Sequence, residues 1–289
     1  MPGIERGRSM ADIVEIDNYS QKKLLEYIKS GGRYLIRFGH GAGDAMMFMP
    51  LMDWLRETYP DCVFDLFVTC GQEAIWASAS ELRPPGYDII FVLHFPMSEG
   101  AGILKQHKCA IDEIGMTRKS LVGIPEIATL PRLPSPLIAC HFQGTALPGS
   151  VNCPEPIAKQ IWQEVKDYGK VPIEVHFQHV FHNWKANPKY SWIDVSVRNY
   201  KPTLPNLFGL IQRCWAFIGV ASGPFVAALS YMPERTLYLE KLHPLHTYTK
   251  NPSVYSVKVD RYVQGQVMGW LSILEQQDNQ APYKTQSRL

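Results

Sequence analysis

The sequence predicts an α/β protein built from two parallel-sheet domains in tandem. Short apolar runs that resemble buried strands alternate along the chain with helical stretches, a pattern typical of parallel sheets covered by helices on both faces. The 289 residues are too many for one ordinary core and suit two. A proline-rich break over 130–136 (LPRLPSP) divides the chain almost in half. We therefore expect domains over 1–135 and 136–289.

The first half contains three apolar runs, each short and bounded by turn residues, as buried strands are. Glycines follow the first expected helix and mark its end. The expected strands are 33–38, 63–68 and 88–93, and the expected helices are 19–29, 44–58 and 102–115.

The second half repeats the alternation of strand and helix. The expected strands are 136–140, 171–177, 192–197, 214–220, 235–240 and 254–259, and the expected helices are 155–168, 204–213, 225–231 and 263–277. We expect the last helix to pack back across the junction between the halves, the polar tail 278–289 to be loose, and 178–191 to be a loop.

Composition excludes wholesale disorder, since 46% of the residues are hydrophobic and 19% charged. The formal net charge is +2, so the molecule as a whole has no strong electrostatic field. Residues 1–135 carry 14 basic and 17 acidic side chains, a net of −3, whereas 136–289 carry 15 and 10, a net of +5. The positive second half suits an anionic ligand.

The first residues lack the apolar segment of a signal peptide, and no apolar run approaches the ~20 residues that span a bilayer. The six cysteines form no C-x-x-C pair and no zinc-type cluster. These observations predict a cytoplasmic protein with reduced, buried thiols and no metal site.

Open parallel sheets bind ligands in the crevice at the carboxyl ends of their strands. The loops that follow the expected strands are therefore the candidate site: 39–43, 94–101, 141–152, 221–224 and 240–247.

The first of these loops, Gly39-His40-Gly41-Ala42-Gly43-Asp44, joins a strand to a helix. Its alternating glycines permit a tight turn and close approach of a ligand, but the spacing is not the G-x-G-x-x-G of dinucleotide sites. Asp44 has two interpretations, a cap of the following helix or a general base at the mouth of the cleft.

The loop Ala221-Ser222-Gly223-Pro224 joins a strand to the next helix. Proline is favoured in a first helical turn, and the free N–H groups there bind phosphate. Ser222 is either a plain N-cap or part of an anion site, and both roles are compatible.

The loop that begins at His141 carries an amide, hydroxyls and a glycine backbone, which suit phosphate oxygens: Gln143, Gly144, Thr145 and Ser150. His141 itself is either a ligand contact or a structural residue that ends a strand.

Taken with the elements around them, these loops resemble glycosyltransferase family 9, the heptosyltransferase-like enzymes of GT-B architecture. The matching features are Gly43-Asp44, Pro50, Leu55-Arg56, Tyr59-Pro60, His141, Pro154-Glu155 and Ser222-Gly223-Pro224 within 204–240. The resemblance covers most of the chain in pattern. It implies two Rossmann-like domains that face a central cleft, with the acceptor bound by 1–135 and a nucleotide sugar by 136–289.

The resemblance also implies a transferase that moves a hexose or pentose to an acceptor hydroxyl with inversion, without a metal or other cofactor. Asp44 would be the general base, with His40 in reserve, and Gly41, Gly43 and His94 would contact the acceptor. The residues implied for the donor are His141, Gln143, Gly144, Thr145, Ser150, Ser222, Gly223, Pro224 and Lys241.

The chain departs from the family at the donor end. Ala221 stands where an acidic residue usually precedes Ser-Gly, neither Phe225 nor Val226 is the usual histidine, and Val151-Asn152-Cys153 replace the stretch that usually holds a lysine. We infer a donor with a different sugar or base, or lost activity, and a heptose donor is disfavoured.

Two other functions stay open: a non-catalytic module that binds nucleotides or glycans, and a nucleotide-sugar epimerase of the same architecture. The expected acceptor is a glycan or a hydroxylated nucleobase in DNA. The nucleobase is suggested by aromatic residues interleaved with basic ones over 184–201. Rings that anchor an irregular loop explain the same residues.

Overall fold

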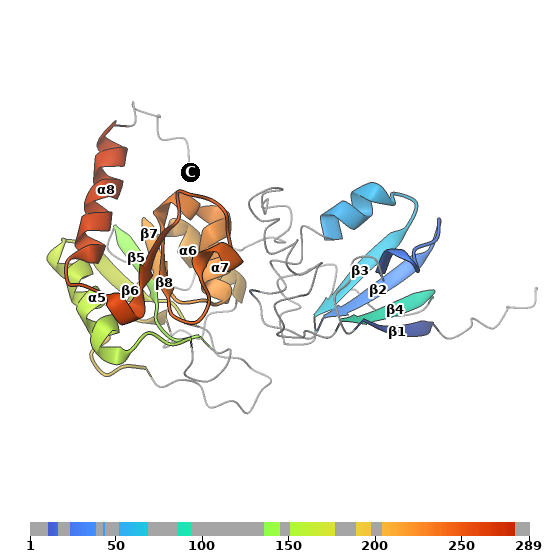
Figure 1. Ribbon diagram of the computed structural model, residues 1–289, viewed down its shortest axis with the longest axis horizontal. Helices are drawn as coiled ribbons and strands as arrows, with labels where there is room; N and C mark the ends of the chain where they lie inside the picture. The colour runs from blue at the N-terminus through green and yellow to red at the C-terminus, as the bar shows by residue number, and fades with distance from the viewer. Residues whose placement is uncertain are drawn as a thin grey trace, which may run out of the picture.

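The structure is a computed structural model that describes residues 11–16, 24–38, 43, 52–68, 86–93, 136–144, 151–176, 189–197 and 204–280. These residues form two parallel β-sheets with helices, one sheet in each half of the chain (Figure 1). The α/β class predicted from the alternation of apolar strands and helices is confirmed.

The N-terminal sheet has the strand order β1-β4-β2-β3, and all neighbouring strands are parallel. Its strands are β1 (Asp12–Ile16), β4 (Ile89–Leu93), β2 (Arg33–Phe38) and β3 (Val63–Val68). The sequence predicted the last three but not β1 (DIVEI), in which acidic residues interrupt the apolar ones. β1 lies at the edge of the sheet and leaves Ile13 64% exposed, so it lacks the continuous apolar run of a central strand.

Stacked aromatic rings form the core of this sheet. The ring of Tyr34 stacks on Phe64 and Phe91, with centroids 5.2 and 5.8 Å apart. Burial raises the pKa of Tyr34, whose hydroxyl accepts a 2.6 Å hydrogen bond from the amide of Lys29.

Two expected helices of this half are described in part. Of the helix expected over 19–29, the structure describes 24–29; among these, 24–25 are helical, and a turn follows at 26–27. Of the helix expected over 44–58, residues 52–58 are helical, and Met52 packs into the core.

The C-terminal sheet has the strand order β6-β5-β7-β8-β9 and is also parallel throughout. Its strands are β6 (Val171–Glu174), β5 (Leu137–His141), β7 (Ala216–Gly219), β8 (Thr236–Glu240) and β9 (Tyr255–Lys258). Its helices are α5 (Glu155–Asp167), α6 (Leu204–Arg213), α7 (Gly223–Tyr231) and α8 (Gln266–Gln280). Each of these strands and helices overlaps a predicted one.

Alternate residues of the central strands face opposite helix layers, as the two-residue period of a strand requires. Ala139, Phe217 and Tyr238 share a core with α6 and α7. Their neighbours Ile138, Ile218 and Leu239 share a second core with α5 and α8. Because both faces of β5, β7 and β8 are covered, these strands are apolar throughout, and this made them visible in the sequence.

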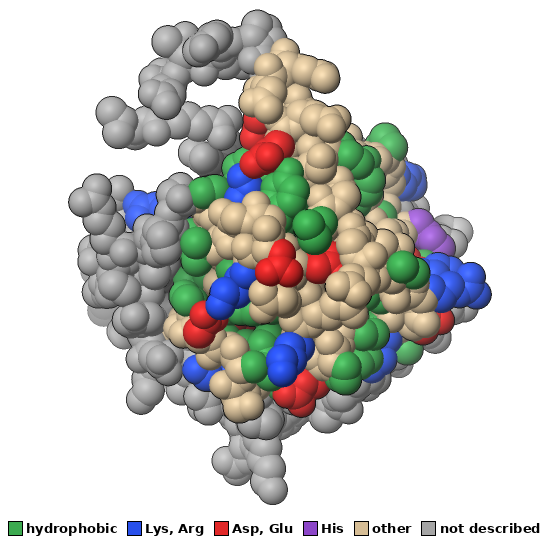
Figure 2. Space-filling view, turned by 90° about the vertical axis from the view of Figure 1, so that its left-hand side faces the viewer, with side chains coloured by type: hydrophobic (Ala, Val, Ile, Leu, Met, Phe, Trp, Pro, Cys, Tyr) green, Lys and Arg blue, Asp and Glu red, His purple; other side chains and the backbone are tan. Residues whose placement is uncertain are grey.

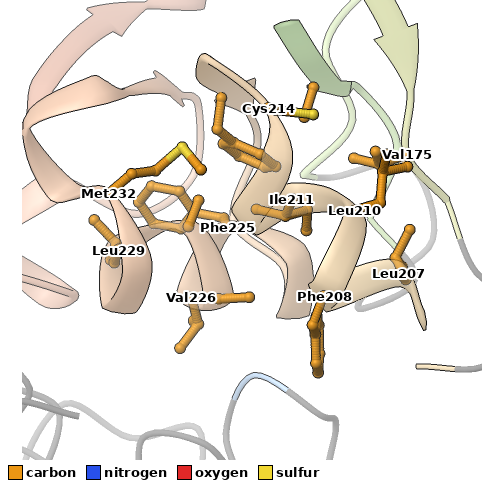
Figure 3. Close-up of a cluster of buried hydrophobic side chains, with 14 of the residues drawn as sticks. Val175, Leu207, Phe208, Leu210, Ile211, Cys214, Phe225, Val226, Leu229 and Met232 are labelled. Carbon is orange, nitrogen blue, oxygen red and sulfur yellow. The ribbon is translucent and has the colours of Figure 1, made fainter. Parts of the chain in front are cut away.

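The helices α6 and α7 lie on the side of the sheet that faces the N-terminal half (Figure 1). In Figure 3, Phe225 and Met232 point into the buried cluster, whereas Phe208 and Val226 point from α6 and α7 toward the N-terminal half. All four side chains are buried, so both sides of this helix layer are packed.

Two expectations for the second half are wrong. The strand expected over 192–197 is reduced to a single bridge between Glu174 and Ser196. Residues 278–280, expected to belong to a loose tail, are helical, since α8 continues to Gln280. The buried side chains of α8, among them Trp270 and Leu274, join α5 in the second core, and packing of this helix across the junction stays a prediction.

Polar contacts fix α8 at both ends. At its start, the buried carboxylate of Glu164 accepts hydrogen bonds from the tyrosine hydroxyl of Tyr262 (2.9 Å) and from the amides of Gly265 (2.9 Å) and Val267 (3.2 Å). This carboxylate therefore caps the first turn and complements the positive end of the helix dipole.

The last turns of α8 are bound to residues that precede strands of the C-terminal sheet. Asp278 pairs with Arg235 and accepts a 2.9 Å hydrogen bond from the indole of Trp215. Glu275 pairs with Lys170, whose ammonium lies 4.4 Å from the ring centroid of Trp215. Figure 2 shows this side of the molecule, where positive and negative side chains are interspersed.

The described cysteines Cys62, Cys140, Cys153 and Cys214 are free and buried. Within the described ranges, no three His, Cys, Asp or Glu residues gather closely enough to hold a metal ion. None of the helices described in the chain has the length and apolar character that crossing a membrane requires.

Candidate functional site

The carboxyl ends of three neighbouring strands lie in register at one edge of the C-terminal sheet. His141 of β5 is opposite Gly219 of β7, which is opposite Tyr238 of β8. The residues three positions further along the chain are Gly144, Ser222 and Lys241, one in each of the loops that follow these strands. Neighbouring strands are ~4.8 Å apart, so the three loops leave the sheet side by side.

His141 ties the ends of β5 and β6 together. Its side chain is 3% exposed, and its Nδ1 atom lies 2.6 Å from the carbonyl oxygen of Val175. A carbonyl only accepts, so Nδ1 carries the proton. The imidazole also stacks on that of His176, with centroids 5.8 Å apart. This geometry supports the structural role that the sequence left open beside a ligand contact.

Gly144 lies where the β5 loop touches the β7 loop. A β-carbon at Gly144 would come within 2.8 Å of the Val151 side chain and 3.1 Å of the Ala221 carbonyl oxygen. The two loops therefore meet closely only because this residue has no side chain. Gln143, its neighbour, is also buried.

Ser222 is the N-cap of α7. Its hydroxyl accepts a 3.3 Å hydrogen bond from the amide of Phe225 and donates a 3.0 Å bond to the carbonyl of Val220. Pro224 occupies the first turn, where the missing N–H costs nothing. The cap predicted at Ser222 is confirmed, and the start of α7 lies at the carboxyl edge of the sheet, where a helix dipole favours an anion.

Gly43 of the N-terminal half lies against this same helix start. A β-carbon at Gly43 would be 3.2 Å from both the nitrogen and the α-carbon of Gly223, and 3.3 Å from a methyl group of Val226. Gly43, which is helical and directly precedes Asp44 in the sequence, therefore meets the first residue of α7.

Aromatic residues pack over the outer side of the β5 loop. Tyr190 stacks on Trp192 at 5.2 Å and donates a 3.2 Å hydrogen bond to the carbonyl of Cys153. The indole of Trp192 donates a 2.9 Å bond to Glu155, at the start of α5, and lies 6.3 Å from the ring of Phe142. These two rings anchor an irregular segment, and the structure does not support a platform for nucleobases.

Lys241 extends from the end of β8 to the β5 loop. Its ammonium donates a 2.9 Å hydrogen bond to the main-chain carbonyl of Asn152. Two loops that are 89 residues apart in the sequence are thereby joined above the sheet edge.

Sequence reasoning missed Glu174, a buried carboxylate at the end of β6. It accepts a 2.5 Å hydrogen bond from the hydroxyl of Ser196, and both residues are nearly inaccessible to solvent. The sequence feature that could have indicated a buried carboxylate is the single acidic residue inside the apolar run Val-Pro-Ile-Glu-Val. The carboxylate binds the segment 189–197 to the sheet.

The remaining candidates lie outside the described residues: Asp44, His40, Gly41, His94, Thr145 and Ser150. The described candidates from the β5, β7 and β8 loops lie along one edge, and Gly43 reaches that edge from the N-terminal half. Their roles in binding stay predictions.

A scan against known protein families finds no match to the chain, and a search of curated proteins finds no relative. Solved structures do share the fold. The iron-containing dodecameric glycosyltransferase TibC of enterotoxigenic E. coli is 13% identical, with 86% of this chain and 77% of that chain aligned at a TM-score of 0.57.

Two further structures align over 86% of this chain and 99% of their own length. The E. coli ADP-heptose LPS heptosyltransferase II is 16% identical with a TM-score of 0.52, and a family 9 glycosyltransferase from Veillonella parvula is 13% identical with a TM-score of 0.51. The chain therefore has the two-sheet α/β fold of the GT-B heptosyltransferases.

Proposed function

We propose that this protein is a glycosyltransferase that uses a nucleotide-sugar donor. One observation carries the proposal: Gly43, at the expected acceptor loop, lies against Gly223, at the start of the expected donor helix. Asp44 follows Gly43 directly in the chain, so the candidate base is the next residue after a contact with the candidate phosphate site. A transfer reaction needs such a junction, because the acceptor hydroxyl must reach the anomeric carbon.

The proposed reaction is a single displacement with inversion. Asp44 takes the proton from the acceptor hydroxyl, whose oxygen attacks the anomeric carbon. The bond between this carbon and the diphosphate oxygen breaks, and the nucleoside diphosphate leaves with the electron pair. Amides at the start of α7 stabilise the negative charge of the leaving group, and the proposal requires no metal or other cofactor.

The donor end of the site separates this chain from the heptosyltransferases it resembles. Ala221 replaces an acidic residue at the donor loop, and its carbonyl faces Gly144. We therefore propose a hexose or pentose donor rather than a heptose, with a glycan as the acceptor. A hydroxylated nucleobase has no support, because Tyr190 and Trp192 pack over a loop of the protein itself.

A binding module without catalysis is the second candidate, and Ala221 is the observation that favours it. An epimerase is less well supported, because its cleft typically needs several acidic and histidine groups and the chain has few at the ends of its strands. The free, buried cysteines fit the reducing conditions of the cytoplasm, which stays our prediction for location.

The first experiment is a thermal-shift screen with ADP, GDP, UDP and CDP and their common sugar conjugates. A ligand at a hundredfold excess over its Kd stabilises the folded state by about 2.7 kcal/mol. A stabilising donor is then used to compare the wild type with Asp44→Asn and with the control Glu57→Gln, which changes an exposed carboxylate on the same expected helix.

We expect Asp44→Asn to bind the donor like the wild type but to lose transfer to a glycan mixture, measured as release of nucleoside diphosphate. Glu57→Gln should retain transfer. The absence of any shift would reject the donor site, and full turnover by Asp44→Asn would reject the base. Binding without turnover by the wild type would favour the binding module.

A further inference from the structure

The contact between Lys241 and Asn152 joins two of the three loops at the candidate donor edge. The Lys241 ammonium lies 2.9 Å from the Asn152 carbonyl oxygen, and the lysine is exposed. An ammonium can donate three hydrogen bonds, so contact with a carbonyl is compatible with contact with an anion. The lysine can hold the loop and an anionic ligand at the same time.

The position of Lys241 in the strand register places it beside the start of α7. Lys241 and Ser222 each lie three residues beyond the paired residues Tyr238 and Gly219. The positive end of the α7 dipole and a lysine ammonium therefore extend from adjacent strands. Glu240, the neighbouring acidic residue, accepts a 3.1 Å hydrogen bond from the amide of Leu245.

The side chain of Asn152 supplies an independent observation. Its Oδ1 atom is buried and finds no hydrogen-bond partner in the part of the chain that the structure describes. A buried acceptor without a partner costs about 1–3 kcal/mol, and native proteins seldom leave one. A ligand hydroxyl would satisfy this oxygen, whereas a phosphate oxygen would not.

We propose that Lys241 and Asn152 recognise the two chemical parts of a nucleotide sugar. Lys241 binds the diphosphate, and Asn152 Oδ1 accepts a hydrogen bond from a hydroxyl of the sugar or of the ribose. The positive charge that binds the diphosphate is thus supplied by Lys241, at the end of β8. The 151–153 segment contains no lysine that could supply it. This inference rests on the proposed function, because it assigns the ligand of the same site.

The test of Lys241 compares Lys241→Met with Lys258→Met by calorimetric titration of ADP, GDP, UDP and CDP and of the four nucleosides. Lys258 lies on the adjacent strand β9, 3.9 Å from Glu240, and its loss removes the same charge. We expect Lys241→Met to weaken diphosphate binding at least about tenfold, as for a charge-assisted hydrogen bond. Nucleoside binding and the urea midpoint should not change, and Lys258→Met should bind like the wild type.

Equal losses for diphosphate and nucleoside would overturn the proposal, because they would show that Lys241 only supports the loop. Unchanged diphosphate binding would overturn it as well. If the wild type itself binds none of the four diphosphates, the proposed function is rejected, and the inference that rests on it is rejected with it.

The test of Asn152 uses Asn152→Leu, which keeps the size of the side chain and removes the acceptor. Weaker binding of the nucleoside identifies the ribose as the source of the hydroxyl. Weaker binding of the nucleotide sugar alone identifies the sugar. Unchanged affinity for both would reject the role of Asn152.

Discussion

The backbone nitrogen of Gly223 lies 3.2 Å from the place where a β-carbon of Gly43 would stand, so the two halves of the chain meet through glycines. This separation is short for contact with a carbon. The helix that follows Gly223 is buried at Pro224 and Phe225 and cannot easily move away.

We therefore expect Gly43→Ala to move residue 43 and the start of α7 apart by a few tenths of an ångström. Transfer depends on the alignment of both substrates, so kcat/KM should fall about tenfold. The measurement is steady-state release of nucleoside diphosphate, with the urea midpoint as a check of folding. Unchanged kcat/KM would show that transfer does not depend on the close approach of Gly43 to Gly223.

Gly269 is the matched control for Gly43→Ala. It lies within α8, and a β-carbon there would meet no atom within 4 Å. Gly269→Ala should leave transfer unchanged and stabilise the fold by about 0.5–1 kcal/mol, because glycine weakens a helix interior.

Substitutions of Ser222 should separate capping from anion binding. Ser222→Ala removes the acceptor for the Phe225 amide and should cost about 1 kcal/mol of unfolding free energy. Ser222→Asp restores a cap but places a negative charge at the start of α7. We expect normal stability and a loss of nucleotide binding for this variant, measured by urea denaturation and calorimetry. If Ser222→Asp binds the nucleotide with the wild-type affinity, the phosphates do not bind at the start of α7.

The buried carboxylate of Glu164 should be a main determinant of stability in the C-terminal half. Glu164→Leu leaves the amides of Gly265 and Val267 without their acceptor and removes the cap of α8. We expect a loss of about 2 kcal/mol or more in the free energy of unfolding. Asp167→Asn, an exposed change on the same helix, should shift it by less than about 0.5 kcal/mol. A similar small shift for Glu164→Leu would mean that α8 is held by its apolar face alone.

The contacts of Asp278 predict a dependence of stability on pH in the acid range. Burial works against ionisation, but the hydrogen bonds from Arg235 and Trp215 prevail and hold the pKa of this carboxyl below its ordinary value. The bond from Lys170 acts in the same direction on the pKa of Glu275. Carboxyls with a lowered pKa stabilise the folded state fully above their unfolded pKa, about pH 4, and lose that contribution as the pH falls through the folded pKa.

The melting temperature of Asp278→Asn should therefore lie below that of the wild type at pH 6, and the difference should shrink between pH 4 and pH 2. Thermal unfolding followed by circular dichroism at five or six pH values measures this convergence. A constant difference over the whole range would assign the stabilisation to packing instead of charge.

The order of strands and helices could be predicted in the second half because β5, β7 and β8 are covered on both faces and hence apolar throughout. β1 was not predicted because it lies at an edge of the sheet, and Asp12 and Glu15 leave it without a continuous apolar run. The segment 192–197 looks like a strand in the sequence, but the ring of Trp192 packs on Phe142 and Trp162, and the segment joins the sheet by a single bridge, between Ser196 and Glu174.

The loops of the candidate site were chosen by the rule that ligands bind at the carboxyl ends of parallel strands, and Ser222 could be predicted as a cap from its place before Gly-Pro. The links between loops could not. The bond from Lys241 to Asn152 and the approach of Gly43 to Gly223 join residues far apart in the sequence, and no local pattern encodes such pairs. Glu174 is likewise recognisable only once Ser196 is placed beside it.

The cap that Glu164 provides for α8 also has a consequence for synthesis of the chain on the ribosome. Glu164 and Gly265 are 101 residues apart, and the second core needs side chains from α8. The four strands of the N-terminal sheet are complete by Leu93. The nascent chain can therefore assemble its first sheet early, whereas in the second half the sheet face that α5 and α8 share stays partly uncovered until nearly all of the protein has been translated. During that interval the exposed apolar face would be a natural target for chaperones.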